Sequence, residues 1–476
     1  MILSVPQIMA SLAEMRPRLI RPGLDDPVRT VFKGLSTDSR KIRPGQLFVA
    51  LVGEKFDGHR FAFQALETGA AGVVVEPGRL DRTAAWPAGA VVIGVPDTLA
   101  ALGLIARSWR LNFKAPLLAV TGSMGKSTVK EMAAGILSLS RRVHKNPGNL
   151  NNLIGLPLTL LDLEAEVEAM VVELGINQKG EMERLVDIAR PDAALITNIG
   201  PVHLEGLGGI QGVAGAKTKL WEGLAPGATA VVNLDDPYLA GPAAGLKVPK
   251  ITFSADPKNS SAEVVLARSA QAGPGRLHLE IKVQGRPITA ELEAMGLFQA
   301  GNALAACAGA LALGAEPEEM ARGLAGFTPL AHRMKVLKGR GGLTIVDDRY
   351  NANPLAMAEA LTALIRMGNN GRRKAAVLGP MAELGGEAEE AHRELGRRVA
   401  ELGLDLLIAI GPLAGIVLEE ARQAGLAKGL TASGPEEAAR LIRRELQPGD
   451  RVLIKGSRVA GLERLVALLT EAGDEL

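Results

Sequence analysis

Short apolar runs alternate with longer amphipathic segments from residue 117 onward. Four of these runs cover residues 117–120, 169–172, 193–196 and 228–232, and stretches with helical spacing of apolar residues lie between them. Continuous apolar strands separated by helices are typical of a parallel sheet that is covered on both faces. The pattern therefore predicts an α/β domain in the middle of the chain.

Related patterns occur on both sides of this region. Residues 1–86 indicate a small α/β unit with a strand at 47–51. Residues 250–292 alternate like short strands, and an alanine-rich helix is expected at 297–313. In the last third, strands are predicted at 375–379, 406–411 and 451–457, with the spacing of repeated βαβ units. We predict an α/β fold with three domains, at 1–86, 87–328 and 329–476.

The first central strand leads directly into a glycine loop, LLAVTGSMGKST. Such a loop points several backbone N–H groups at one anion, and the following helix adds positive potential at its N-terminus. The strict Walker pattern has a glycine where Val120 stands, so the match is to the shorter form T-G-x-x-G-K-[ST]. The loop is predicted to bind a nucleotide through Thr121, Gly122, Ser123, Met124, Gly125, Lys126, Ser127 and Thr128.

Polar residues that follow the next two strands are candidate magnesium ligands. Glu173 ends one apolar run, His203 follows another, and Lys217 stands fourteen residues after His203. Because the carboxyl ends of parallel strands share one edge of a sheet, these side chains can converge on Ser127 and form two magnesium positions around a triphosphate. Taken singly, each is more typical of a solvated or hydrogen-bonded residue.

Two polar stretches are candidate substrate sites. The segment NPGNLNNLIGLPLTL carries Asn146, Asn149, Asn151 and Asn152, whose amides can bind a substrate and are equally common in tight turns. Near the N-terminus, Ser39 and Arg40 lie in a polar turn that could grip a diphosphate or a sugar, or could be a solvated loop.

Composition narrows the function classes. With 476 residues, of which 47% are hydrophobic and 22% charged, the chain is expected to be globular and soluble. A net charge of +2 and an aromatic content of 3% disfavour nucleic-acid binding. Cys307 is the only cysteine, so no internal disulfide can form. The N-terminus lacks the pattern of a secretion signal and no apolar run is long enough to span a bilayer, so we expect a cytoplasmic protein with small-molecule partners.

Motifs along nearly the whole chain resemble those of the Mur ligase family. They are DSRKIRPGQLFVAL and DGHRF in the first unit, TGSMGKST, NPGNLNNLIGLPLTLL, ELGINQKGEM and HLEGLGGIQGVAGAK in the second, and AHRMKV, DDRYNANP, ELGGEAEEAH and KGSR in the third. The tyrosine-containing YNANP resembles most closely the member of the family that adds D-alanyl-D-alanine. The resemblance implies a small N-terminal substrate domain, a central ATPase domain and a Rossmann-like C-terminal domain.

The implied activity is an ATP-dependent ligation in peptidoglycan precursor synthesis. The carboxylate of UDP-N-acetylmuramoyl-tripeptide would be phosphorylated by ATP, and the amine of D-alanyl-D-alanine would then attack the acyl phosphate. The cofactors implied are ATP and two Mg²⁺ ions, and the protein is expected to be a monomer. Two alternatives remain open: another ligase of the same build, of Mur type or folylpolyglutamate-synthase-like, and a nucleotide-binding module without turnover.

The resemblance also implies roles for single residues. Lys126 and Ser127 would serve the triphosphate, Glu173 and His203 the metals, and Lys217 would carry a carbamate. Asn302 would contact adenine, and Arg333 would reach the γ-phosphate from the third domain. Three residues of the third domain would lie near adenosine: Asp347, Tyr350 and Asn351. Ser39 and Arg40 would lie near uridine. The chain departs from the family pattern at Met124, Gln178, Phe298, Gln299, Arg349 and Pro380. The third domain is expected to close over ATP.

Overall fold

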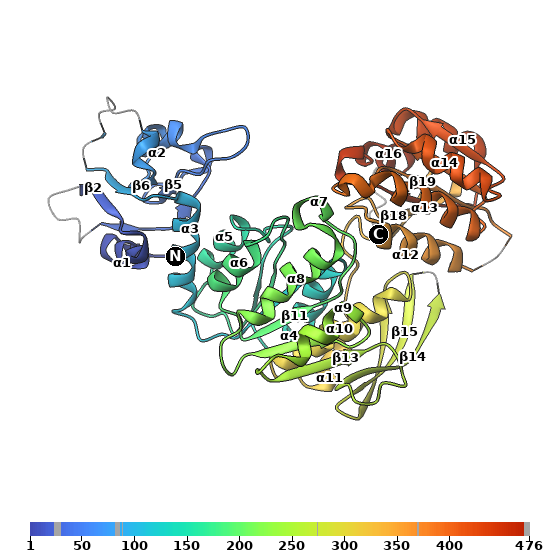
Figure 1. Cartoon of the computed structure of the whole chain (residues 1–476), viewed down its shortest axis with the longest axis horizontal. Helices are drawn as coiled ribbons and strands as arrows, with labels where there is room; N and C mark the ends of the chain where they lie inside the picture. The colour runs from blue at the N-terminus through green and yellow to red at the C-terminus, as the bar shows by residue number, and fades with distance from the viewer. Residues whose placement is uncertain (23–29, 81–85, 88, 274, 369–370, 471–476) are drawn as a thin grey trace.

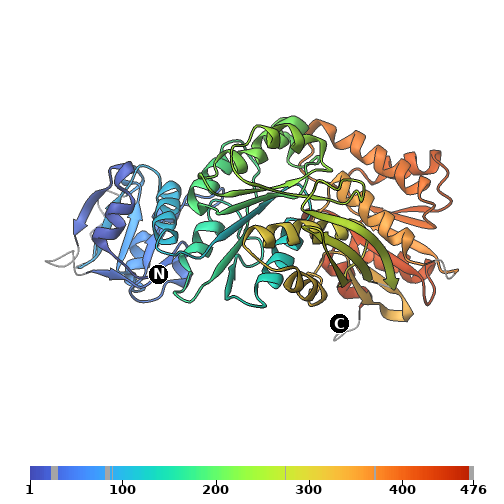
Figure 2. The ribbon, with the colours of Figure 1, turned by 90° about the horizontal axis from the view of Figure 1, so that it is seen from below.

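The computed structural model describes residues 1–22, 30–80, 86–87, 89–273, 275–368 and 371–470. Three α/β units follow one another along the long axis of the molecule, as Figure 1 and the view from below in Figure 2 both show. The small first unit (blue) and the third unit (orange to red) lie on opposite sides of the large central unit. None of the helices in the described ranges has the length and apolar character needed to cross a membrane.

The first unit contains a five-stranded sheet in the order β2-β7-β6-β5-β4, which is parallel except at β2. The strands are β2 (Arg18–Pro22), β4 (Leu35–Ser36), β5 (Leu47–Val49), β6 (Gly72–Val75) and β7 (Val91–Gly94). A separate antiparallel pair joins β1 (Leu3–Ser4) to β3 (Val31–Phe32). The helices are α1 (Val5–Ser11), α2 (Ala62–Glu67) and α3 (Thr98–Arg110), with short 3₁₀ turns η1 (Ala13–Met15), η3 (Ser39–Lys41), η4 (Gly58–Phe61) and η5 (Pro77–Arg79).

The first sheet extends beyond residue 86, where the first domain was predicted to end, because β7 pairs with β6 and β2. Helix α3 then leads into the central unit. Its N-cap is Asp97, whose carboxylate accepts the backbone N–H of Ala100 at 2.9 Å. The apolar face of α3 packs against two helices of the central unit, α5 (Gly155–Leu161) and α6 (Glu181–Ala189), so α3 connects the two units.

The central unit contains a nine-stranded sheet in the order β16-β15-β14-β13-β12-β11-β8-β10-β9. Its pairs are parallel from β9 to β14 and antiparallel from β14 to β16. The strands are β8 (Leu117–Thr121), β9 (Val143–Lys145), β10 (Ala169–Glu173), β11 (Ala193–Ile196), β12 (Thr229–Asn233), β13 (Lys250–Ser254), β14 (Val264–Gly273), β15 (Arg276–Val283) and β16 (Arg286–Glu293).

Helices cover both faces of this sheet, as continuous apolar strands require. Helices α4 and α10 pack on one face, and α5, α6 and α8 pack on the other. The further helices are α4 (Lys126–Leu137), α7 (Leu204–Leu207), α8 (Gly209–Glu222), α9 (Pro237–Ala244), α10 (Phe298–Ala312) and α11 (Pro317–Ala325). In register, Glu173 of β10 lies beside Val120 and Ile196 of β11 beside Thr121, so the three strands end together at one edge.

The third unit contains a six-stranded sheet in the order β17-β18-β22-β19-β20-β21, parallel except at β17. Its strands are β17 (Lys335–Lys338), β18 (Thr344–Asp347), β19 (Lys374–Leu378), β20 (Leu406–Ile410), β21 (Gly429–Ala432) and β22 (Arg451–Lys455). The helices are α12 (Pro354–Arg366), α13 (Ala388–Glu401), α14 (Ala414–Gln423), α15 (Pro435–Glu445) and α16 (Glu463–Leu469), with 3₁₀ turns η6 (Arg340–Gly342), η7 (Gly385–Glu387) and η8 (Arg458–Ala460).

Candidate active site

The loop between β8 and α4 has the geometry of an anion cradle. Gly122 and Gly125 have φ angles of 145° and 79°, in the region that favours glycine. A Cβ atom at Gly122 would collide with Thr197, and one at Gly125 with Asn302. Both glycines are therefore required by backbone conformation and by close packing, and helix α4 begins directly behind the loop.

Residues that follow β11 form hydrogen bonds to this loop and fix its backbone. Asn198 accepts the backbone N–H of Met124 at 2.9 Å through Oδ1, and its backbone carbonyl accepts the N–H of Ser123 at 2.9 Å. Thr197 Oγ1 donates to the carbonyl of Met124 at 2.5 Å. The Ser123 hydroxyl donates to the carbonyl of Gly200 at 3.0 Å. Because these bonds fix the loop without a ligand, the cradle is already formed.

Lys126 folds back over the loop. Its Nζ donates to the carbonyl of Gly122 at 2.8 Å. Burial lowers the pKa of Lys126, the charge of Glu173 opposes this shift, and the charge of Arg333 adds to it. Thr121 and Thr128 are buried, and the Thr121 hydroxyl donates to the carbonyl of Leu174 at 2.8 Å.

Glu173 lies at the centre of a group of hydrogen bonds. The Ser127 hydroxyl donates to Glu173 Oε2 at 2.5 Å, and the amide of Asn151 donates to Oε1 at 2.7 Å. Arg333 Nη2 donates to the Ser127 oxygen at 2.9 Å. Arg333 belongs to the third unit, which therefore reaches the phosphate loop directly. The hydroxyl and carboxylate oxygens stand side by side, as a hard cation such as Mg²⁺ prefers.

His203 and Lys217 lie in the electrostatic field of this group. Lys217 is 1% exposed on α8, and burial followed by the charge of Lys126 moves its pKa well below the ordinary value, whereas Glu173 opposes the shift. Burial also lowers the pKa of His203; Glu383 opposes this shift, and the charges of Lys126 and Lys217 add to it. In the described part of the chain, no three His, Cys, Asp or Glu side chains gather to hold a metal on their own.

A pocket of about 80 Å³ lies beside the phosphate loop. Asn302 lines it, and the Nδ2 of this residue donates to Gln299 Oε1 at 2.8 Å. The glutamine that replaces the usual family residue therefore holds Asn302 in place. The pocket is also lined by Thr197, Asn198, Asn233, Asp235, Phe253, Ala255, Phe298, Gly301, Leu304 and Ala305. Aromatic and amide side chains of this kind suit a flat heteroaromatic ligand.

Of the predicted nucleotide residues of the third unit, Tyr350 contacts Arg333, and Asp347 and Asn351 have other partners. The guanidinium carbon of Arg333 is 3.9 Å from the centre of the Tyr350 ring. Asp347 is buried and accepts from Arg349 Nε at 3.0 Å, with His332 Nδ1 at 2.8 Å. The backbone carbonyl of Asn351 accepts from Lys455 Nζ at 2.9 Å. Arg349, which departs from the family pattern, thus neutralises Asp347.

Models of three Mur ligase domains match the chain. "Mur ligase family, catalytic domain" matches residues 31–110, "Mur ligase middle domain" residues 120–310, and "Mur ligase, glutamate ligase domain" residues 332–458. The chain belongs to the Mur ligase family. The prediction of the family is confirmed.

Similar proteins cover more than nine tenths of this Mur ligase. The UDP-N-acetylmuramoyl-tripeptide--D-alanyl-D-alanine ligase of Bacillus subtilis is 34% identical, over 98% of this chain and 99% of its own. The ligase of the same name from Escherichia coli is also 34% identical, over 92% and 94%. A crystal structure of MurF from Acinetobacter baumannii aligns with a TM-score of 0.87 at 31% identity and 98% coverage of both chains. MurF from Thermotoga maritima, solved with ADP, aligns at 0.80 with 30% identity, over 91% of this chain and 96% of its own. These structures confirm the predicted three-unit α/β fold.

The predicted substrate residues of the Mur ligase lie in different settings. Asn152 Oδ1 accepts the backbone N–H of Gly155 at 2.9 Å at the start of α5, and Asn149 is exposed. Arg40 is exposed and pairs with Asp38 through two contacts of 2.9 Å, which lower the pKa of Asp38 to about 2. Ser39 is partly buried beside it in η3. These four residues lie outside the group formed by Lys126, Ser127 and Glu173, whereas Asn151, which was also predicted, donates to Glu173.

Two buried residues shape the site: Asn146, which the sequence offered only as a candidate substrate contact, and Lys130, which was not predicted. Asn146 is fully buried, and its Oδ1 accepts the backbone N–H of Glu173 at 2.9 Å. Lys130 is 1% exposed and donates to the carbonyl of Asn146 at 2.7 Å. Lys130 stands one helical turn after Lys126, which is the signal that could have placed it on the same side of α4.

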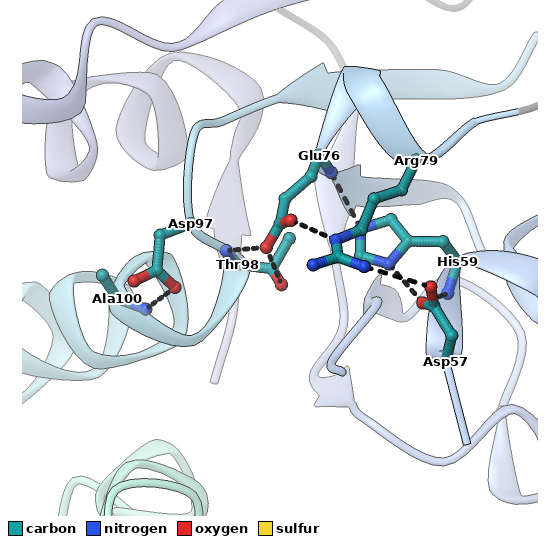
Figure 3. Close-up of polar contacts among 7 residues, drawn as sticks. All are labelled: Asp57, His59, Glu76, Arg79, Asp97, Thr98 and Ala100. Atoms are coloured by element: carbon teal, nitrogen blue, oxygen red, sulfur yellow. Dashed lines mark hydrogen bonds and ion pairs between the residues drawn. The ribbon is translucent and has the colours of Figure 1, made fainter. Parts of the chain in front are cut away.

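A second polar group, in the first unit, was not predicted (Figure 3). His59 Nδ1 lies 2.7 Å from Asp57, and its Nε2 accepts the backbone N–H of Glu76 at 2.9 Å. Glu76 in turn accepts from Arg79 at 2.6 Å and from the backbone N–H of Thr98, the first residue of α3, at 3.2 Å. This network ties the DGHRF turn to the helix that enters the central unit.

Proposed function

We propose that this Mur ligase joins D-alanyl-D-alanine to the terminal carboxylate of UDP-N-acetylmuramoyl-tripeptide and converts ATP to ADP and phosphate. The names of its relatives support this choice of substrates. The observation that carries the proposal is the contact of Arg333 with Ser127 at 2.9 Å, because it places a cation of the third unit at the phosphate loop. An ATP bound there would lie between the two units.

The chemistry follows from the stability of a free carboxylate, which resists attack by an amine. Transfer of the γ-phosphoryl group to the carboxylate gives an acyl phosphate and ADP. Lys126 and Arg333 offset the negative charge that develops during the transfer. The amine of D-alanyl-D-alanine then attacks the acyl carbon, phosphate leaves, and the nitrogen loses a proton as the amide forms. No protein nucleophile is needed, so positioning is the main contribution of the protein.

Mg²⁺ would be held by Ser127 and Glu173, with His203 and Lys217 around a second ion. The donor set of the first ion fits, because Mg²⁺ commonly takes one or two protein carboxylates and completes its shell with phosphate oxygens and water. At the second position, a carbamate on Lys217 would supply the oxygen donors that an amine lacks. When bound, the ions neutralise charge on the phosphates. The hydrogen bond from Asn151 then keeps Glu173 oriented toward Ser127.

Lys217 is proposed to carry a carbamate. Burial and the neighbouring Lys126 favour the neutral amine. A neutral amine can attack CO₂ and lose a proton, which gives an N-carboxylate with two oxygens. The product is an anion close to the cation of Lys126, so an opposite-charge pair forms where a neutral amine stood. Mass spectrometry of intact protein kept under CO₂ would detect the added mass, and Lys217→Ala would lack it.

The remaining contacts complete the proposal. Adenine would occupy the pocket lined by Asn302, with the adenosine near Asp347, Tyr350 and Asn351. The backbone N–H groups of residues 121–128 would bind the phosphates. The uridine nucleotide would lie near Ser39 and Arg40, and the peptide near Asn149, Asn151 and Asn152. We propose a cytoplasmic monomer with no nucleic-acid partner. The first domain boundary is proposed to follow β7, after residue 94, and the second lies near residue 329.

A donor-selectivity assay tests the proposed function. The protein is incubated with UDP-N-acetylmuramoyl-tripeptide, ATP, Mg²⁺ and one of four amine donors: D-alanyl-D-alanine, meso-diaminopimelate, L-lysine or glutamate. We expect phosphate release and a pentapeptide mass with D-alanyl-D-alanine alone. Turnover with another donor would assign a different ligase, and ATP binding without substrate-dependent phosphate release would identify a non-catalytic nucleotide-binding module.

A further inference from the structure

Arg333 lies in a short segment of unusual backbone at the start of the third unit. The residues on either side of it, His332 and Met334, have φ angles of 63° and 56°, in the left-handed region that residues with a Cβ rarely adopt. Backbone of this kind persists only where the surrounding structure over-determines it. Because β17 begins directly after Met334, the conformation of this segment sets where the Arg333 side chain leaves the third unit.

A buried carboxylate holds the segment on one side. Met334 is 4% exposed, and its backbone N–H donates to Asp348 Oδ1 at 3.1 Å. On the other side, the carbonyl of His332 accepts the backbone N–H of Tyr350 at 3.2 Å. The backbone ladder between β17 and β18 ends one position before Met334 and Asp348. The Asp348 side chain therefore extends the contact between the two strands into the segment.

Asp348 is itself anchored by a buried lysine. Lys455, at the end of β22, is 3% exposed, and its Nζ donates to Asp348 Oδ2 at 2.6 Å and to the carbonyl of Asn351 at 2.9 Å. The backbone N–H of Asp348 also donates to a carbonyl of β22, at 3.0 Å. One carboxylate oxygen thus binds Lys455 and the other binds Met334, so the carboxylate links β22 to the segment that carries Arg333.

The guanidinium of Arg333 is aimed at the phosphate loop. Its central carbon lies 3.9 Å from the centre of the Tyr350 ring, and its Nη2 donates to the Ser127 oxygen at 2.9 Å. A cation stabilises a transferring phosphoryl group only when it stands where the charge develops, and a displacement of about 1 Å can lower a rate about 100-fold. A residue that fixes the backbone beside Arg333 can therefore affect turnover without touching the substrates.

We propose that Asp348 and Lys455 are positioning residues for Arg333: their ion pair fixes the backbone of Met334 and so directs the guanidinium at the phosphate loop. This inference rests on the proposed function, in which Arg333 offsets charge during phosphoryl transfer. Neither Asp348 nor Lys455 has a proposed contact with nucleotide or substrate. Since the pair lies entirely within the third unit, it orients Arg333 independently of how that unit docks on the central one.

The first test separates positioning from stability. Phosphate release with saturating UDP-N-acetylmuramoyl-tripeptide and D-alanyl-D-alanine gives kcat and the KM for ATP, and urea unfolding gives stability. We expect Asp348→Ala to lower kcat about 10- to 100-fold and to change the KM for ATP less than about 3-fold. Asp450→Ala is the matched control, because Asp450 is a buried carboxylate at the opposite end of β22 and accepts from Arg373 Nε at 2.9 Å. The control should lose stability and keep a kcat near that of the wild type.

Two further variants approach the same pair differently. Lys455→Met removes the cation and leaves the buried carboxylate uncompensated, so kcat should fall as in Asp348→Ala. Asp348→Asn keeps an oxygen for the N–H of Met334 and should lose less. Wild-type kcat in Asp348→Ala, an equal kcat loss in Asp450→Ala, or a loss confined to the KM for ATP would overturn the proposal. Where Asp348→Ala does not fold, the same criteria apply to Lys455→Met and to the near-isosteric Asp348→Asn.

The second test asks whether the pair acts through Arg333. Arg333→Ala should lower kcat about 10²- to 10³-fold. Adding Asp348→Ala to it should cause little further loss, because the guanidinium that the carboxylate positions is already gone. Losses in kcat that multiply in the double variant would overturn this inference alone. Wild-type kcat in Arg333→Ala would instead overturn the proposed role of Arg333, and the inference with it.

Discussion

The buried His59 and the partly buried His203 of this Mur ligase have contrasting surroundings. His59, in the first unit, has both ring nitrogens paired, one with Asp57 and the other with the backbone of Glu76 (Figure 3). His203, in the central unit, is contacted on one nitrogen by Glu383 and lies near the charges of Lys126 and Lys217. A fully paired polar network stabilises a fold, whereas buried charges that lack partners destabilise it and are available to a ligand. The comparison separates a structural site from a functional one.

The largest expected effect is on turnover when Lys126 is removed. Lys126→Ala should lower kcat on the order of 10²- to 10³-fold, since one cation that offsets the charge of the transferring phosphoryl group is lost. The free energy of unfolding should change by less than about 1 kcal/mol, because a partly buried cation near Arg333 is removed together with its hydrogen bond. Phosphate release and urea unfolding measure the two quantities. Lys219→Ala, at an exposed lysine of α8, is the control, and near-wild-type turnover of Lys126→Ala would contradict the assignment.

At His59 the expected effect is on the stability of the fold. His59→Ala should lower the free energy of unfolding by about 2–4 kcal/mol, because it leaves the N–H of Glu76 without a partner, removes one partner of the Asp57 carboxylate and opens a cavity. His278→Ala, at a partly exposed histidine paired with Glu291, should cost less than about 1 kcal/mol. If urea unfolding showed equal losses in the free energy of unfolding for the two variants, the structural role of the network would be contradicted.

Lys217 should show a pH-dependent effect on stability. Its pKa in the folded protein lies below the ordinary value of 10.5, so the unfolded chain binds more protons between the two values and wild-type stability rises with pH across that window. Lys217→Met should therefore be more stable than the wild type by about 1–2 kcal/mol below the folded pKa. The difference should shrink as the pH rises toward 10.5. Urea unfolding in CO₂-free buffer tests this, and a difference that is constant with pH would contradict it.

The smallest effect is expected at Arg79, the partly exposed member of the network in Figure 3. Its side chain is 46% exposed and pairs with Glu76 at 2.6 Å. Exposed ion pairs contribute little, so Arg79→Ala should lower the free energy of unfolding by less than about 1 kcal/mol, and less at high salt. A loss as large as that of His59→Ala would mean that the ion pair, and not the histidine, holds the network together.

The sequence predicted the features that depend on neighbouring strands of one sheet: the strands, the glycine loop and the contact at the shared sheet edge. The apolar runs became β8, β10 and β11, and the glycines of the loop have the positive φ angles expected of them. Ser127 and Glu173 are in contact, as the shared edge of a parallel sheet led us to expect. These features follow from the alternation of strands and helices, which short-range patterns of apolar and polar residues determine.

Contacts between units could not be predicted in the same way. Arg333 and Ser127 are separated by 206 positions, and their contact depends on how two units dock. The resemblance to the family named Arg333, whereas nothing in the residues pointed to Glu383 beside His203. Amide side chains were ambiguous for another reason, because the same donor and acceptor serve turns, helix caps and ligands equally well, as Asn146 and Asn152 illustrate.

The most direct test of the account is anomalous diffraction from crystals grown with Mn²⁺ and a non-hydrolysable ATP analogue. We predict two manganese peaks, one within ligand distance of Ser127 Oγ and Glu173, and another beside His203 and Lys217. A single peak elsewhere, or a nucleotide bound away from the loop at residues 121–128, would contradict the claim that the incompletely paired charges of the central unit are arranged for a metal-bound polyphosphate.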